Sequence, residues 1–221
     1  MLMNKKPVSF ALKIATPTFA FVGVFISLLF ANRDGYSHWS RRLLYFTAQS
    51  NLWIGIVFLL VFVCRKSSLL PRIYLLKYVF TVSITVTGLV FCFLLAPFSD
   101  ESYTPWTFCN ILTHVLTPLF AIADFFLDEY RISLKKTAVF SALLPPFLYC
   151  VFAWILESFH VDFGRGVPYP YFFLNYRSPA KLFGFSNEPP FFVGSFYWLI
   201  LFLLLVLTIS LLYARHIEKR R

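Results

Sequence analysis

The sequence predicts an all-α protein that spans a membrane, because it is more apolar than the surface of a water-soluble domain allows. Of its 221 residues, 59% are hydrophobic, 14% are charged and 29 are phenylalanine. The apolar residues gather in six long runs separated by polar segments. Each run is long enough to cross about 30 Å of hydrocarbon as a helix that rises about 1.5 Å per residue.

The six predicted transmembrane helices cover most of the chain, so we expect residues 1–221 to form a single domain. They lie at about residues 12–31, 44–64, 74–95, 107–127, 137–157 and 191–213. The first run follows Lys5 and Lys6, as a signal peptide would. It extends too far and lacks a clear small-residue cleavage site, so we interpret it as a helix of the protein.

The basic residues predict the orientation of the helices. Fourteen of the 20 Lys and Arg residues lie at the termini and around the second and fourth loops, and six lie in the other loops. The positive-inside rule therefore places both termini in the cytoplasm. The net charge of +10 comes from clusters that flank apolar runs and would meet lipid headgroups. We expect membrane lipids as partners and no nucleic acid.

The fifth loop, residues 158–190, is the one long connection, and this orientation puts it outside. Its glycines and prolines disfavour a regular helix, and its aromatic content predicts packing on the membrane surface or a cap over the bundle. The four cysteines lie in or at the ends of apolar runs and lack the spacing of metal ligands. We expect no metal and no other cofactor.

A cluster of polar residues begins the second helix, close to the predicted outer surface. The stretch "YFTAQSN" contains Thr47, Gln49, Ser50 and Asn51. On a helix Thr47, Ser50 and Asn51 share one stripe and can face a common pocket, whereas Gln49 sits to the side. Such side chains more often bond to backbone or to adjacent helices. Four of them within seven residues is a dense cluster, which keeps a binding or reactive site open.

His114 is the sharpest single feature, because an ionisable side chain inside a spanning helix usually faces a cavity or a polar partner. It lies about 10 Å below the outer start of the fourth helix. Asn110 shares its face, and Pro118 can kink the helix beside it. Thr87 of the third helix reaches a similar depth. The alternative is a histidine that merely bonds across helices.

Charged and aromatic residues at the predicted outer rim have two interpretations. They include Glu157, Asp162, Arg165, Trp106, Tyr169 and Tyr171. The charged residues could bind a polar head or a carboxylate, but more often such groups are solvated at the interface. The aromatic residues fit an interfacial belt without a further role. The sequence contains no GxSxG or HExxH motif and no phosphate-binding glycine loop. No common motif therefore assigns the protein to a class of enzyme.

Four stretches of the sequence are similar to one known family. They are "YFTAQSN", "SITVTGLVFCFLLAP", "NILTHVLTPLFAIAD" and "GVPYPYFFLN". They resemble the six-helix membrane proteins of the androgen-induced protein family, especially its bacterial branch, and the resemblance runs from about residue 12 to 213. Characterised animal members are threonine hydrolases that cleave fatty acid esters of hydroxy fatty acids, with a threonine in helix 2 and a histidine in helix 4.

The resemblance implies an intramembrane hydrolase of lipid-like esters, located in a bacterial plasma membrane with its site toward the outer face. Thr47 would be the nucleophile and His114 its base. Residues expected to bind the substrate or its oxyanion are Asn110, Ser50, Asn51, Gln49, Thr87 and Tyr169. The "QSN" and the proline after the histidine depart from the animal pattern, so the animal lipid is not carried over. No acid is evident to orient the imidazole, which leaves Asn110 or a backbone carbonyl.

Two other classes of function remain open. The same pocket could belong to a binding or transport protein that holds a lipid or a small polar molecule without altering it. A carrier usually needs access from both sides, often through broken helices or repeats, whereas the polar groups here cluster toward one face. A purely structural role would leave the dense polar cluster without a purpose.

Overall fold

The computed structural model describes residues 5–98, 104–130, 132, 134–164 and 166–219. The protein is 69% helical and has no strand among these residues. Six segments of this part are long and apolar enough to cross a membrane: Pro7–Leu29, Phe46–Val63, Leu70–Leu95, Phe108–Leu127, Thr137–Ser158 and Ser195–Lys219. Each overlaps one predicted helix, so the predicted all-α fold class with six spans is confirmed.

Three spans are single helices and three are composite. The single ones are α1 (Lys5–Leu29), α2 (Phe46–Val63) and α8 (Ser195–Lys219). The third span is α3 (Leu70–Val90) followed by a π-helix at Phe91–Leu95. The fourth is α4 (Phe108–Ile111), a π-helix at Leu112–Leu116 and α5 (Thr117–Leu127). The fifth is α6 (Lys136–Ser141) and α7 (Leu144–Ser158), divided because Pro145 and Pro146 at the start of α7 have no N–H for a continuous helix.

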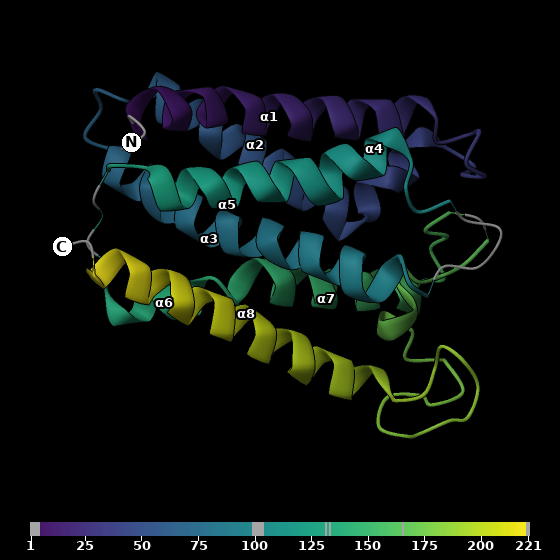
Figure 1. Ribbon diagram of the computed structural model, residues 1–221. Helices are drawn as coiled ribbons and strands as arrows, with labels where there is room; N and C mark the ends of the chain where they lie inside the picture. The colour runs from purple at the N-terminus through teal and green to yellow at the C-terminus, as the bar shows by residue number, and fades with distance from the viewer. Residues whose placement is uncertain (1–4, 99–103, 131, 133, 165, 220–221) are drawn as a thin grey trace.

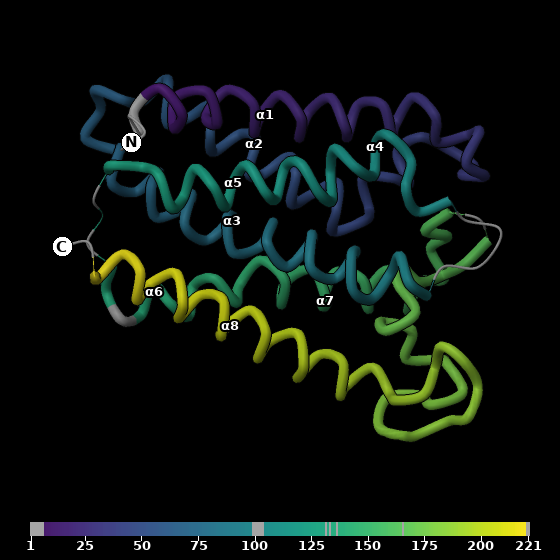
Figure 2. The backbone as a smooth tube through the Cα atoms, in the orientation of Figure 1, coloured from purple at the N-terminus to yellow at the C-terminus, as the bar shows by residue number. Residues whose placement is uncertain are grey.

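The bundle is built around α3. This helix packs against α2, α5 and α8, while α1 packs against α2 and α5, and α8 also contacts α6 and α7. In Figure 1, α3 and α5 run through the middle, with α1 and α2 above them and α7 and α8 below. Figure 2 shows that the start of α1 and the end of α8 lie at the same end of the bundle. That this end is cytoplasmic stays a prediction from the positive-inside rule.

The buried hydroxyl groups of α3 are satisfied within the helix. Thr81, Ser83, Thr85 and Thr87 each donate to the carbonyl four residues earlier, at 2.7–3.2 Å. Because hydrocarbon offers no water to a polar group, such bonds allow hydroxyl groups in the centre of a membrane bundle.

The two halves of the fifth loop are arranged differently. Its first half folds back onto the bundle, where Phe163, Phe173 and Leu174 are buried. A short 3-10 turn at Phe172–Leu174 lies within this half. The second half extends beyond the start of α8 (Figure 1) and leaves Phe183 and Phe185 exposed. That these rings pack on a membrane surface stays a prediction.

A cluster of charges joins α1, α3 and α5 at the end of the bundle that holds the start of α1. Lys77 Nζ contacts Asp124 and lies 2.5 Å from Asp128 Oδ2, and Lys13 Nζ lies 2.8 Å from Asp124 Oδ1 and 3.0 Å from Asp128 Oδ2. We call these four residues the ion cluster. Two cations balance two carboxylates, which makes their burial tolerable. The sequence could not reveal this pairing, because the four residues come from three segments that lie far apart in the chain.

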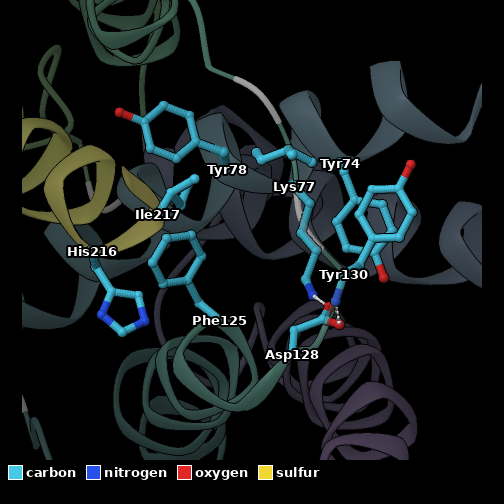
Figure 3. A pocket seen from close by; sticks show the side chains of 9 residues that line it. Tyr74, Lys77, Tyr78, Phe125, Asp128, Tyr130, His216 and Ile217 are labelled. Atoms are coloured by element: carbon cyan, nitrogen blue, oxygen red, sulfur yellow. Dashed lines mark hydrogen bonds and ion pairs between the residues drawn. The ribbon is translucent and has the colours of Figure 1, made fainter. Parts of the chain in front are cut away.

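A small cavity lies beside the ion cluster, as Figure 3 shows. It has about 40 Å³, room for about one water molecule. Lys77 and Asp128 meet in its wall, beside the stacked rings of Tyr74 and Tyr130. Burial alone would raise the pKa of the Asp128 carboxyl, just beyond the fourth span, but Lys77 and Lys13 outweigh burial and lower this pKa. The carboxylate therefore stays charged at neutral pH.

Replacing Asp124 with leucine should cost about 3–5 kcal/mol of stability, because it leaves the buried Lys77 and the partly buried Lys13 with one carboxylate between them. The measurement is the midpoint of thermal unfolding of the purified protein in detergent. Glu188→Gln, at an exposed loop position, is the control and should leave the midpoint unchanged.

The double variant Asp124→Leu/Lys77→Met keeps the charges balanced and should lose less stability than Asp124→Leu alone. An Asp124→Leu protein as stable as Glu188→Gln would mean that the ion cluster does not hold the three helices together.

Candidate functional site

Thr47 and His114 line the same two cavities, toward the end of the bundle opposite the ion cluster. The smaller cavity, about 60 Å³, is here called the apolar pocket, and its other walls include Phe46, Val86, Thr87, Tyr149, Cys150 and Phe202. The larger, about 230 Å³, is called the polar chamber, and its walls include Tyr36, Arg42, Tyr45, Phe91, Asn110 and Thr113. Tyr171 and Leu95 also line both. The predicted nucleophile and base therefore share a site between an apolar and a polar compartment.

A π-helical turn positions His114. Thr117 N–H bonds to the Leu112 carbonyl five residues earlier, and Pro118 has no N–H for the His114 carbonyl. Gly88 of α3 fits against this exposed backbone, where a Cβ atom would lie 3.0 Å from the His114 oxygen and 3.0 Å from Pro118 Cβ. The sequence indicated that Pro118 can kink the helix here. The structure has a π-turn immediately before this proline, a feature often found at functional sites.

The imidazole is held by stacking and not by an acid. Its ring stacks on Phe91, with centroids 3.9 Å apart and planes at 13°, and lies beside the backbone of Thr87. His114 is buried, and within the described part of the chain its Nδ1 has no hydrogen-bond partner. No Asp or Glu lines either cavity in that part of the chain. A neutral imidazole with a free nitrogen can accept a proton from a group in the cavity.

Tyr171 of the fifth loop reaches the start of α2. Its hydroxyl oxygen lies 3.5 Å from Thr47 Oγ1 and accepts a hydrogen bond from the Thr47 backbone N–H at 3.4 Å. Burial raises the pKa of the Tyr171 phenol to about 12, while its contacts with Thr47 act to lower it. The phenol therefore keeps its proton at neutral pH and can donate a hydrogen bond beside Thr47.

Asn51 and Ser50 fix the start of α2 and line neither cavity. Asn51 Nδ2 donates to the carbonyls of Thr47 at 2.8 Å and Thr113 at 3.1 Å. Ser50 Oγ lies 3.2 Å from the Thr47 carbonyl and 2.9 Å from the Thr87 hydroxyl. Both residues are fully buried. They tie Thr47 to α3 and to the segment that carries His114, and the amide donors of Asn51 are already occupied.

The other predicted site residues divide between the cavities and their surroundings. Asn110 lines the polar chamber, with Nδ2 bonded to the Pro105 carbonyl at 2.8 Å, and Thr87 lines the apolar pocket. Gln49 turns back to the Leu43 carbonyl at 3.2 Å. Tyr169 packs edge-on against Phe191 and lines neither cavity.

The charged residues of the predicted rim behave differently from solvated interface charges. Glu157, at the end of α7, is fully buried, and its carboxylate oxygens have no hydrogen-bond partner among the described residues. Asp162 accepts a hydrogen bond from Gly164 N–H at 2.7 Å and so closes a turn. Arg165 lies outside the described residues. Gly164 has φ +122° and sits against the ring of Tyr36, which any side chain would strike, so this turn seals the loop onto the wall of the polar chamber.

Sequence reasoning missed two residues of the site. Tyr171 was interpreted as an interfacial aromatic residue, although the quoted "GVPYPYFFLN" contains it beside Tyr169. Arg42 was counted only among the loop charges, yet it lines the polar chamber. The available signal was a run of arginines in a loop that the positive-inside rule expects to be poor in them.

Searches with this chain match no protein family, no curated protein and no solved structure.

Replacing Asn51 with leucine should destabilise the protein by about 2 kcal/mol or more, because the backbone carbonyls of Thr47 and Thr113 each lose one hydrogen bond in a buried position. Gln49→Leu, from the same stretch, removes one bond at a partly exposed position and should cost less. Thermal unfolding in detergent measures both. Equal losses for the two variants would argue against Asn51 as the tie between α2 and the π-turn.

Proposed function

We propose that this protein is an intramembrane hydrolase of lipid-like esters in which Thr47 is the nucleophile and His114 the general base. The observation that carries the proposal is that these two side chains, 67 positions apart in the sequence, line the same two cavities. The resemblance to the androgen-induced protein family supports the same pair of roles. The alternative is a protein that binds a lipid or small molecule without altering it.

In the first half of the reaction, the Thr47 hydroxyl oxygen would bond to the ester carbonyl carbon while its proton passes to His114. The C–O bond to the alcohol then breaks, and the imidazolium returns the proton to the departing alkoxide. The products are a free alcohol and an acyl-threonine. In the second half, water gives a proton to His114 and its oxygen bonds to the acyl carbon. The bond from this carbon to the Thr47 oxygen then breaks, and His114 returns the proton to that oxygen. The products are a fatty acid and the restored Thr47 hydroxyl.

The Tyr171 hydroxyl, which lies 3.5 Å from Thr47 Oγ1, would stabilise the oxyanion by donating a hydrogen bond. The Thr47 N–H donates to this hydroxyl oxygen and would hold it in position. Tyr171 thus takes the part that sequence reasoning gave to Asn51 or Ser50, whose polar groups are engaged with backbone and Thr87. The Thr87 backbone beside the imidazole is the group placed to fix its tautomer, in the absence of an acid.

The two compartments suit an amphipathic ester. An alkyl group near Thr47 would lie in the apolar pocket of α2, α3, α7 and α8, with the rest of a long chain passing between the helices into lipid, because about 60 Å³ cannot enclose it. The polar part would occupy the chamber. With the predicted orientation, the site faces the outer leaflet of a bacterial plasma membrane, and water reaches it from the outside.

Thr47→Ala and His114→Gln should each lower ester hydrolysis by at least about a thousandfold, with an unchanged midpoint of thermal unfolding. Thr208→Ala, at an exposed position of α8, is the matched control and should keep full activity. A fluorophosphonate probe should label the wild-type protein and neither site variant. Full activity of Thr47→Ala would remove this mechanism, and binding of lipid esters without any turnover would favour the alternative.

Tyr171→Phe should lower kcat by about 100-fold, with a small change in KM, because the lost hydroxyl acts chiefly on the developing oxyanion. Tyr169→Phe is the control, since it removes the same group from a neighbouring tyrosine that lines neither cavity. Steady-state kinetics of the two variants with one ester substrate gives the comparison. Equal kcat values would take Tyr171 out of the reaction.

A further inference from the structure

We propose that the polar chamber binds the anionic head of an amphipathic ligand, a carboxylate or a phosphate, and that Arg42 is its anchor. The inference rests on the proposed function in that it names the class of ester the site takes. Its binding step does not depend on turnover and can be measured separately.

Arg42 stands where the chamber meets a second, larger cavity. It lies in the 3-10 turn Trp39–Leu44 before α2 and lines the polar chamber together with Thr47 and His114. It also lines a cavity of about 830 Å³, here called the outer vestibule, whose walls include Arg33, Asp34, Thr104, Thr107 and Asn110. Arg42 and Asn110 are common to both cavities. A ligand that passes from the vestibule toward Thr47 would meet the guanidinium group.

The contacts of Arg42 hold its side chain in place but leave one of its N–H groups without an acceptor. Its Nη2 pairs with the Asp34 carboxylate, and its guanidinium carbon lies 4.1 Å from the centre of the Tyr36 ring. The side chain is only 14% exposed, so it is folded inward. Its Nε is buried and has no hydrogen-bond partner among the described residues. A buried guanidinium N–H without an acceptor is costly, and a ligand oxygen would supply one.

The charges around the two cavities favour an anion. Arg33 and Arg42 line the vestibule or chamber, and Asp34 is the one carboxylate that lines them in the described part of the chain. An excess of positive charge between low-dielectric walls attracts anions more strongly than the same charge in open water. A solvated loop arginine would point outward, whereas the Arg42 side chain is only 14% exposed and lines the chamber beside the candidate reaction site.

The apolar pocket would hold the alkyl part of the ligand. It lies against Thr47 and His114, as the polar chamber does, so a ligand with an alkyl part and an anionic end would put its ester bond at Thr47. The site would therefore prefer anionic amphiphiles to neutral esters such as acylglycerols.

Equilibrium binding to the purified full-length protein in detergent tests the inference with two pairs of ligands. Ricinoleate is compared with ricinoleyl alcohol, and lysophosphatidate with monoacylglycerol, so that each pair differs in its anionic group. By titration calorimetry, at least one anion should bind about tenfold or more tightly than its neutral counterpart. The pair that shows the preference identifies a carboxylate or a phosphate as the source, and both pairs together indicate a general anion site.

Arg42→Gln should abolish the preference and leave the affinity for the neutral ligands unchanged, which also shows that this variant is folded. Arg42→Lys retains the charge and should retain part of the preference. Arg41→Gln removes the adjacent arginine, which lines neither cavity, and should behave as wild type.

Equal affinity of the wild type for both members of each pair, or a preference that survives in Arg42→Gln, would overturn the inference. Thr47→Ala separates the two proposals, because it should keep the binding preference while losing hydrolysis. Hydrolysis that requires Thr47 but shows no binding preference would contradict the anion site alone. A Thr47→Ala protein that still hydrolyses esters would contradict the proposed reaction alone.

Discussion

The structure depends on one constraint: a polar group inside the hydrocarbon layer must find its partner within the protein. Most of this bundle obeys it closely. The hydroxyl groups of α3 bond to their own helix, Tyr78 bonds to Ser210 of α8, and the ion cluster balances its own charges. Some buried polar atoms do not obey it. Three of those without a partner among the described residues, His114 Nδ1, Arg42 Nε and Asn51 Oδ1, belong to residues that line or border the polar chamber. Others, such as the Glu157 carboxylate oxygens, lie outside its walls.

The two ends of the bundle use polar residues in opposite ways. At one end, Lys13 and Lys77 meet Asp124 and Asp128, and the cavity beside them has room for about one water molecule. This arrangement joins helices and leaves little space for a ligand. At the other end, two interrupted helices open cavities around a histidine. Helices α1 and α3 contribute residues to both ends.

The two π-turns explain how an apolar bundle makes room for cavities around a histidine. One, at Leu112–Leu116, carries His114, and the other, at Phe91–Leu95, begins with the residue that stacks on its ring. Each π-turn inserts an extra residue into a helix, which widens the turn and shifts the side chains that follow. Gly88 allows the two segments to approach closely. The imidazole is thus oriented by packing, where a soluble hydrolase would often use a carboxylate.

The sequence by itself determined the six spans, because the thickness of the membrane sets how long an apolar helix must be. It also marked Thr47 and His114, since polar groups in such helices are costly enough to stand out. It could not place Tyr171, Arg42 or Lys77, because an aromatic residue in a loop, or a lysine near a helix end, looks the same whether it faces lipid, solvent or a cavity. Only the tertiary structure decided these, through the approach of segments far apart in the chain, and the same packing turned Asn51 from an expected oxyanion donor into a tie between helices.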